Sequence, residues 1–236
     1  MNEAINLEKL NVNYGDKAVI HNFNFSIPQN TFLAIVGHNG CGKSSLLRSI
    51  ANLQPFSGSI KILSKELSQI PNIYKSGLMS FLSQNQQIGF DINVRELLLM
   101  GRHRFSTLFS SYSNQDFSML DQVIKELGLE RYINQNFLEL SGGEQQLILF
   151  AQTILQDAKI LLLDEPTQNL DIKNGYKIIQ YLNYLVQEKQ KTVIISTHDL
   201  HHLTNVIGNI LNMSCELTAE VINPKNLQKH TELLRK

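Results

Sequence analysis

Residues 37–45 read Gly-His-Asn-Gly-Cys-Gly-Lys-Ser-Ser and fit the pattern G-x-x-x-x-G-K-[ST] without a gap. The apolar run Phe32–Val36 precedes this stretch, and residues 44–51 look helical. Glycines let successive backbone N–H groups crowd around an anion, and the helix N-terminus adds the positive end of its dipole. The order strand, glycine turn, helix therefore predicts a phosphate-binding loop. Lys43 would reach the terminal phosphates, and the Ser44 hydroxyl would ligate Mg²⁺.

The bulk composition excludes several classes of protein. The 236 residues include 21 Lys and Arg and 21 Asp and Glu, so the net charge is zero. This balance argues against broad binding to nucleic acid or anionic lipid. We find no signal peptide and no apolar run near the ~20 residues that span a bilayer. The two cysteines, Cys41 and Cys215, are far apart, which favours a reduced cytosolic protein over a disulfide framework.

The first third of the chain has the period of strands. Residues 3–27 alternate apolar and polar side chains, with a turn at 14–16, which predicts two half-exposed strands. Residues 59–63 and 78–82 are two further strand-like runs.

The pattern becomes helical between residues 93 and 155. Ser113 and Asp116 fit a helix start signal. The residues spaced for one buried face of that helix are Phe117, Leu120, Ile124 and Leu127.

The last third alternates strands and helix. Residues 160–163 are wholly apolar and end in acids, as a buried parallel strand does, and residues 192–196 predict another. The amphipathic helix between them has one apolar stripe, formed by Ile172, Tyr176, Ile179, Leu182 and Val186. This alternation predicts a parallel α/β sheet with a helical insertion over about residues 85–155.

The strand at 160–163 delivers two adjacent carboxylates, Asp164 and Glu165, to its C-terminal end, where α/β sheets bind ligands. Neighbouring residues of a strand point in opposite directions, so the two acids are expected to do different jobs. We infer that Asp164 holds Mg²⁺ and that Glu165 accepts a proton from the attacking water.

A third motif is Leu-Ser-Gly-Gly-Glu-Gln at residues 140–145. Ser141 and Glu144 have capping-box spacing at the start of a predicted helix, which by itself describes a well-capped helix. The alternative interpretation is a second anion site, because the two glycines expose N–H groups at a helix N-terminus.

Taken together, residues 37–45, 140–144 and 160–166 resemble the nucleotide-binding subunit of an ABC transporter. Leu-Ser-Gly-Gly-Glu matches the signature sequence of that family, and the resemblance runs in order from Tyr14 to about His198, most of the chain. The resemblance identifies Tyr14 with the residue that stacks on adenine, Gln84 with the glutamine loop and His198 with the switch histidine. Residues 169–171 match the short loop after the acids.

The resemblance implies a set of site residues. The catalytic residues would be Glu165, His198 and Gln84, and Mg²⁺ would be held by Ser44, Gln84 and Asp164. The residues expected to bind ATP are Tyr14, Gly37, Asn39, Gly40, Cys41, Gly42, Lys43, Ser44, Ser45, Ser141, Gly142, Gly143 and Asp171.

The resemblance also implies a fold and an assembly. The fold is α/β, with a phosphate-loop (RecA-like) core, an antiparallel β subdomain and an inserted α-helical subdomain. Residues 1–236 would form one ABC ATPase domain, with 1–84 and 156–236 as the core and 85–155 as the helical subdomain. Because the phosphate loop of one copy faces the signature of another, a homodimer is expected, with ATP binding closing it and hydrolysis reopening it. Its partners would be a membrane permease and, indirectly, a substrate-binding protein, at the cytoplasmic face of the inner membrane.

The stretch Met-Gly-Arg-His at residues 100–103 resembles cassettes that power importers of iron–siderophore, haem and cobalamin complexes. Cassettes of zinc or manganese transporters have a similar sequence at this point and remain an alternative. Two other classes are a soluble ABC ATPase acting on ribosomes or DNA, and a degenerate cassette that binds ATP without hydrolysis. The single cassette and neutral charge disfavour the first, and retention of Lys43, Asp164, Glu165 and His198 disfavours the second.

One departure concerns the helix after the signature. Relatives usually have a basic residue there, whereas this chain has Gln145, Gln146 and Leu147. The charged contacts of that helix are therefore in question, but not the phosphate site.

Overall fold

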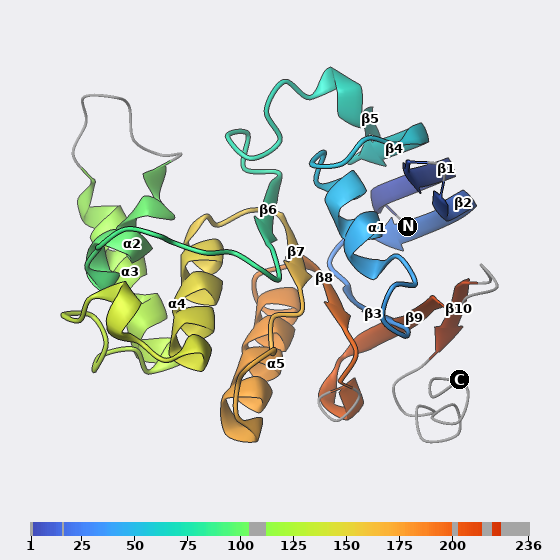
Figure 1. Cartoon of the computed structure of the whole chain (residues 1–236). Coiled ribbons are helices and arrows are strands. Elements are labelled where there is room, and N and C mark those ends of the chain that lie inside the picture. The colour runs from blue at the N-terminus through green and yellow to red at the C-terminus, as the bar shows by residue number, and fades with distance from the viewer. Residues whose placement is uncertain (1, 16, 104–111, 200–202, 214–218, 223–236) are drawn as a thin grey trace.

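A computed structural model describes residues 2–15, 17–103, 112–199, 203–213 and 219–222 of the chain. Two sheets and a set of helices make up these residues (Figure 1). The strands are β1 Glu3–Tyr14, β2 Lys17–Pro28, β3 Phe32–Val36, β4 Ser57–Ile62, β5 Lys65–Glu66, β6 Met79–Leu82, β7 Ile160–Asp164, β8 Thr192–Thr197, β9 Gly208–Met213 and β10 Ala219–Ile222. The α-helices are α1 Lys43–Ile50, α2 Val94–Met100, α3 Asn114–Leu127, α4 Gly142–Leu155 and α5 Ile172–Gln187.

The larger sheet has the strand order β10-β9-β3-β8-β7-β6. Its central strands β3, β7 and β8 are buried throughout, as strands covered on both faces must be. The pairings of β3 with β8 and β9, and of β7 with β6 and β8, are parallel, whereas β10 pairs antiparallel with β9. The carboxyl ends of β3, β7 and β8 therefore meet at one edge of the sheet.

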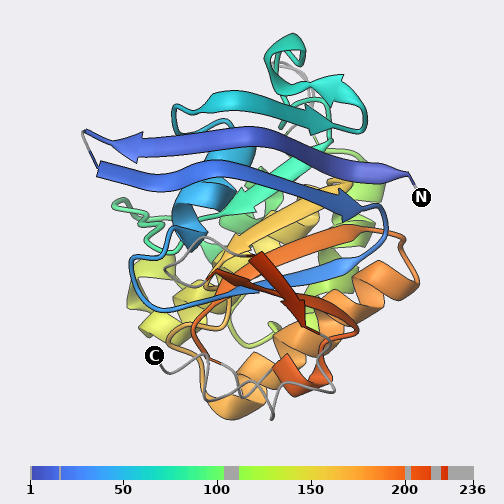
Figure 2. The same cartoon turned by 90° about the vertical axis from the view of Figure 1, so that its right-hand side faces the viewer.

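The smaller sheet has the order β2-β1-β4-β5 and is antiparallel. Its inward side chains pack with α1 and with one face of the larger sheet in a single apolar cluster. Figure 2 shows the resulting layers, with the antiparallel sheet over α1 and the larger sheet below them. The predicted antiparallel β portion and phosphate-loop core are confirmed.

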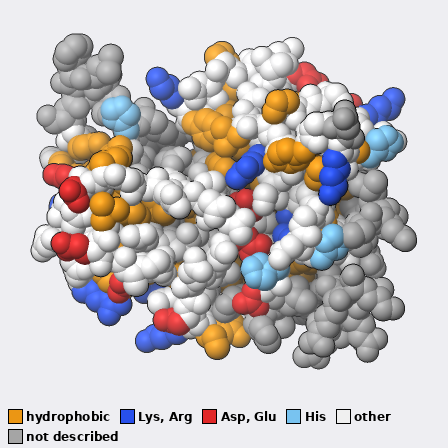
Figure 3. Space-filling view, viewed as in Figure 1, with side chains coloured by type: hydrophobic (Ala, Val, Ile, Leu, Met, Phe, Trp, Pro, Cys, Tyr) orange, Lys and Arg blue, Asp and Glu red, His pale blue; other side chains and the backbone are white. Residues whose placement is uncertain are grey.

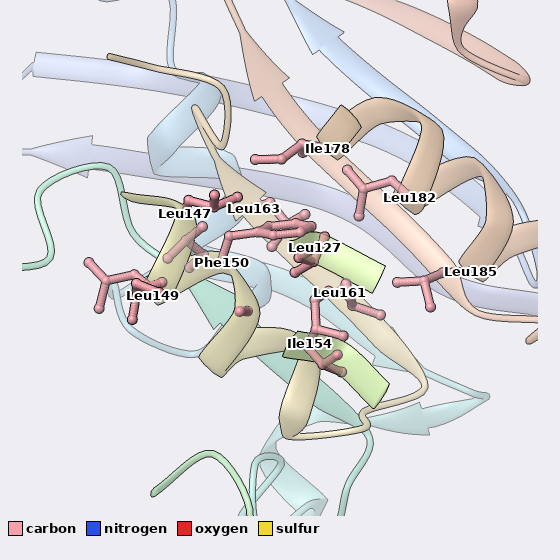
Figure 4. Packing of buried hydrophobic residues seen from close by; sticks show 14 of the residues in the cluster. Leu127, Leu147, Leu149, Phe150, Ile154, Leu161, Leu163, Ile178, Leu182 and Leu185 are labelled. Atoms are coloured by element: carbon pink, nitrogen blue, oxygen red, sulfur yellow. The ribbon is translucent and has the colours of Figure 1, made fainter. Parts of the chain in front are cut away.

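The second apolar cluster lies on the other face of the larger sheet, under α2, α3, α4 and α5. Figure 4 shows side chains of α4, α5 and β7 meeting there, among them Phe150, Leu163 and Ile178. The helices that separate β6 from β7 in sequence are thus packed on the face opposite α1. No helix within the described residues combines the length and the apolar character that crossing a membrane requires.

The predicted helix starts are confirmed, but two expected core residues are not. Ser113 and Asp116 form the capping box of α3. Phe117, expected on the buried face of α3, is instead an exposed large side chain, and its ring lies edge to face with the ring of Tyr112. Val123 takes its place, because positions 120, 123, 124 and 127 form the stripe that faces the core.

Ile172 is the second wrong prediction, and Tyr176 of the same predicted stripe is only half-buried. Ile172 was placed on the buried stripe of α5 and is 72% exposed. It is the first residue of the helix, and the periodic pattern gives its angle around the helix but not whether another element covers it there. Asp16 of the predicted turn and Cys215 lie outside the described residues.

A buried ion pair ties the helices together. Arg102, just after α2, donates from Nε to Asp116 Oδ1 at 2.8 Å and from Nη1 to the Leu155 carbonyl at 2.9 Å. Burial raises the pKa of Asp116, but hydrogen bonds from Ser113 and then the charge of Arg102 outweigh it and hold that pKa below its ordinary value. The pair therefore joins the end of α2, the start of α3 and the end of α4.

We expect Arg102→Met to lower the free energy of unfolding by about 3–5 kcal/mol, because it leaves the Asp116 carboxylate buried without its cation. The matched control is Arg95→Met, since Arg95 pairs with Asp121 at 3.7 Å on the surface and such pairs contribute less than about 1 kcal/mol. Urea unfolding followed by circular dichroism measures both. Equal shifts for the two variants would contradict a stabilising role for the buried pair.

Candidate functional site

The phosphate-loop motif connects β3 to α1, as predicted. Gly40 and Gly42 have φ of 83° and 102°, a region that residues with a Cβ avoid, so the loop needs glycine at both positions. Lys43 begins α1, and its Nζ donates to the carbonyl oxygens of Gly37 at 2.8 Å and His38 at 3.2 Å. The ammonium group is thereby held against the loop at the N-terminus of a helix.

This loop opens on a pocket with a volume of about 540 Å³. Most residues predicted from the phosphate loop line it, together with residues from three other parts of the chain. The lining residues are Tyr14, Lys17, Val19, Asn39, Gly40, Gly42, Lys43, Ser44, Ser45, Gln84 and Glu165. Gly37 and Cys41 belong to the same loop but do not line the pocket.

Sequence reasoning missed Lys17 and Val19. Both lie at the start of β2, and Lys17 pairs directly with Tyr14 of β1 across the hairpin. The hairpin prediction contained the signal, because residues on either side of a short turn share one end of the sheet. Tyr14 itself is 53% exposed, and its hydroxyl donates to Gln54 Oε1 at 3.0 Å.

Asp164 ends β7 directly beside the phosphate loop. Its Oδ1 accepts hydrogen bonds from Ser44 Oγ at 2.9 Å and from Ser196 Oγ at 2.5 Å. Its Oδ2 is buried and has no hydrogen-bond partner among the described residues. An unpaired buried carboxylate oxygen is costly, and a cation at this point would satisfy it.

The oxygens available here are a hydroxyl (Ser44), a carboxylate (Asp164) and the side-chain amide of Gln84, which is half-buried at the same pocket. Oxygen donors of these kinds are the ligands that Mg²⁺ takes in proteins. The residues present therefore fit Mg²⁺. Within the described residues, no group of three or more His, Cys, Asp or Glu side chains forms a separate metal site.

Glu165 follows Asp164 but leaves the strand. Its φ is 54°, so the alternation of side-chain direction ends at Asp164 and both acids lie at the same edge of the sheet. Glu165 Oε2 lies 2.9 Å from His198 Nδ1, the glutamate being buried and the histidine exposed. The pair joins the ends of β7 and β8.

The signature residues lie away from this pocket. Ser141 donates from its N–H and its hydroxyl to Glu144 Oε2, at 2.9 and 2.7 Å, which confirms the capping contact at the start of α4. These bonds hold the pKa of Glu144 below its ordinary value. Ser141 and Gly142 are exposed, and none of Ser141, Gly142 and Gly143 lines the pocket.

The loop after the acids packs against the signature. A Cβ placed on Gly143 would lie 2.6 Å from the carbonyl oxygen of Asn169, so glycine is needed for this approach. Asp171 caps α5, its Oδ1 accepting the Asn174 N–H at 2.7 Å. Asp171 is exposed and does not line the pocket either.

The residues that replace the usual basic residue after the signature make uncharged contacts. Gln145 Nε2 donates to the Phe137 carbonyl at 3.1 Å, and Gln146 Nε2 donates to the Glu165 carbonyl at 3.5 Å. Leu147 is buried in the cluster of Figure 4. The helix therefore reaches Glu165 without a charged residue.

The Met-Gly-Arg-His stretch has a structural account within the fold. A Cβ on Gly101 would lie 2.5 Å from the Gln152 carbonyl oxygen, and Arg102 makes the buried pair with Asp116. Met100 is exposed, as is Phe90 in the segment that precedes α2. On the face shown in Figure 3, acidic, basic and histidine side chains lie close together over the middle of the molecule, with hydrophobic side chains gathered near its upper edge.

Comparison with known proteins places these features in context. A family model described as "ABC transporter" matches residues 20–168. The chain is 31% identical to a petrobactin import ATP-binding protein of Bacillus anthracis, over 89% of this chain and 78% of that protein. It is 29% identical to a probable siderophore transport system ATP-binding protein of Bacillus subtilis, over 92% and 89% of the two chains. A zinc uptake system ATP-binding protein of Listeria innocua is 27% identical, over 91% and 84%.

Solved structures give the same picture. A putative metal-chelate type ABC transporter in an inward-facing conformation superposes with a TM-score of 0.80 at 27% identity, covering 99% of this chain and 89% of that one. A dimeric ATP-binding cassette with ADP and Pi, in a post-hydrolysis state, superposes with a TM-score of 0.78 at 25% identity, covering 93% and 99%.

Proposed function

The chain belongs to the ABC transporter family as an ATP-hydrolysing, nucleotide-binding cassette, and from this premise we propose that it powers the import of iron–siderophore, haem or cobalamin-type metal chelates. One observation carries the ATPase assignment. The phosphate loop and Glu165 line one pocket, and Asp164 accepts a hydrogen bond from Ser44 of that loop, while the signature and Asp171 of the same chain lie outside the pocket. Such an arrangement is half of a site that a second copy completes.

The residues of the pocket have distinct roles in this proposal. Tyr14 stacks on adenine, and the glycine loop with Lys43 and Ser45 holds the phosphates. Ser44, Asp164 and Gln84 would hold Mg²⁺, which when bound would supply positive charge beside the phosphates. Glu165 accepts the proton of the attacking water, and His198, 2.9 Å from it, contacts the γ-phosphate.

The second copy supplies the other half of each site. Ser141 and Gly143 of the partner face the phosphates, and Asp171 lies at the interface. The exposed Ser141, Gly142 and Asp171 support this homodimer, since nothing in the described part of their own chain covers them. ATP closes the dimer and hydrolysis reopens it. The division into a core of residues 1–84 and 156–236 and a helical subdomain of 85–155 allows the signature to move relative to the pocket.

The conformational work passes to a membrane permease. We place its docking surface near Gln84 and residues 85–105, where Phe90 and Met100 are exposed apolar side chains. Residues 104 and 105 lie outside the described part of the chain. The cassette is held by the permease at the cytoplasmic face of the membrane, a substrate-binding protein delivers the cargo on the other side, and no nucleic acid is involved.

Affinity purification of the tagged chain from detergent-solubilised native membranes, with mass spectrometry of what accompanies it, tests this partnership. A polytopic permease is expected, and the family of that permease reduces the number of possible cargoes. Recovery of soluble partners alone, such as ribosomal proteins, by a chain that still binds ATP would favour the soluble ATPase.

Uptake measurements separate the two cargo classes. Cells lacking the chain, complemented with wild type or Lys43→Ala, are supplied with ⁵⁵Fe–siderophore or ⁶⁵Zn. Only wild type is expected to restore iron uptake. Restoration of zinc uptake instead would assign the chain to the zinc or manganese group.

A further inference from the structure

Ser196 carries a buried hydroxyl directly after the apolar run of β8. It lies in β8 after Val193, Ile194 and Ile195, has no exposed surface, and pairs in register with Asp164 of β7. A hydroxyl in such a place costs free energy unless it is hydrogen-bonded. Its partners therefore show what it does.

Those partners are the two acids of the site. Ser196 Oγ donates its proton to Asp164 Oδ1 at 2.5 Å and accepts the Glu165 N–H at 3.1 Å. A hydroxyl has one proton and two lone pairs, so it makes both bonds at once. A single oxygen atom thus bridges the side chain of Asp164 and the backbone of Glu165.

The first bond fixes which oxygen of Asp164 is available. Oδ1 already accepts from Ser196 and from Ser44, whereas Oδ2 has no partner in the described residues. With two donors on Oδ1, the carboxylate is held in one orientation. Oδ2 is the oxygen left for a cation.

The second bond supports the backbone of Glu165. Its φ of 54° lies in the left-handed region, which is unfavourable for a residue with a Cβ. The Glu165 N–H meets both the carbonyl of Ser196, at 3.2 Å, and its Oγ. This conformation turns the side chain to His198 instead of letting it continue the alternation of β7.

We propose that Ser196 is a positioning residue. It orients both the Mg²⁺-binding oxygen of Asp164 and the proton-accepting carboxylate of Glu165. This inference rests on the proposed ATPase function. Groups that orient metal ligands typically contribute 10–100-fold to metal affinity or activity. Ser196 therefore acts on metal binding and on turnover, but not on the phosphate loop.

The test compares Ser196→Ala with Ser80→Ala. Ser80 is also fully buried in a strand of the same sheet, but its hydroxyl has no hydrogen-bond partner in the described residues, which makes it a matched control. Mn²⁺ binding in the presence of a non-hydrolysable ATP analogue is measured by electron paramagnetic resonance. ATP affinity in EDTA, kcat and KM are measured in parallel.

For Ser196→Ala we expect Mn²⁺ affinity and kcat to fall by about 10–100-fold, with unchanged ATP affinity in EDTA. Ser80→Ala should match wild type. Ser196→Cys, which leaves no cavity but is a weak donor, should resemble Ser196→Ala, and it replaces that variant if the smaller side chain of alanine impairs folding.

Wild-type values for Ser196→Ala and Ser196→Cys, or an equal loss in Ser80→Ala, would overturn the proposal. Failure of wild type to hydrolyse ATP with Mg²⁺ would instead refute the proposed function, and the Mn²⁺ measurement would still decide the role of Ser196.

Discussion

Glu165→Gln is expected to abolish ATP turnover while leaving ATP binding intact, so that the protein accumulates as an ATP-bound dimer. The amide has the size of the carboxylate but cannot accept a proton from water, and loss of a general base costs about 10²–10⁴-fold in rate. Glu165 is buried at the pocket next to His198. Among the described residues that line the pocket there is no other carboxylate to take its place as the base. Static light scattering with Mg-ATP, together with phosphate release, measures both effects.

Glu188→Gln is the control, because it removes a glutamate charge at the exposed end of α5, away from the pocket. It should hydrolyse ATP as wild type does. A Glu165→Gln protein that stays monomeric with Mg-ATP, or that hydrolyses at the wild-type rate, would remove Glu165 from the role of base.

Lys43→Ala is expected to weaken nucleotide binding severely. The Lys43 ammonium is held by Gly37 and His38 over the phosphate loop, where it pairs with oxygens of the β- and γ-phosphates in the proposed complex. A hydrogen bond to a charged group contributes about 1.5–3 kcal/mol, so its loss raises the Kd for ATP by roughly 10- to 100-fold. Isothermal titration calorimetry measures this Kd.

Lys65→Ala provides the comparison, since it removes an exposed lysine from β5, outside the pocket. Its ATP affinity should equal that of wild type. An unchanged Kd for Lys43→Ala, in a protein that unfolds as wild type does, would refute the phosphate contact.

The sequence predictions that held best concern single short segments whose own residues determine their structure. Two capping boxes pair residues that are three positions apart, Ser113 with Asp116 and Ser141 with Glu144. Their pairing can therefore be predicted from their spacing in the sequence. The apolar runs of β3, β7 and β8 are buried on both faces, and strands of this kind appear in a sequence as continuous runs of apolar residues. The phosphate loop is likewise a single stretch.

The errors and omissions came from contacts between distant segments. Phe117 and Ile172 have the period of buried residues, but which elements pack against each helix decides whether they are covered. Gln54 and Tyr14 are 40 residues apart, and nothing near Gln54 in the sequence indicates that it accepts the Tyr14 hydroxyl. Ser196 looked like one residue of an apolar strand.

The sequence by itself determined the fold class, the family and the location of the phosphate loop, the acids and the signature, because each is a short segment with its own backbone requirement. Only the tertiary structure decided that Ser196 bridges Asp164 and Glu165, and that Asp164 Oδ2 has no hydrogen-bond partner among the described residues. The physical reason is that parallel strands bring residues some 30 positions apart into register, and that register decides which side chains come within hydrogen-bonding distance.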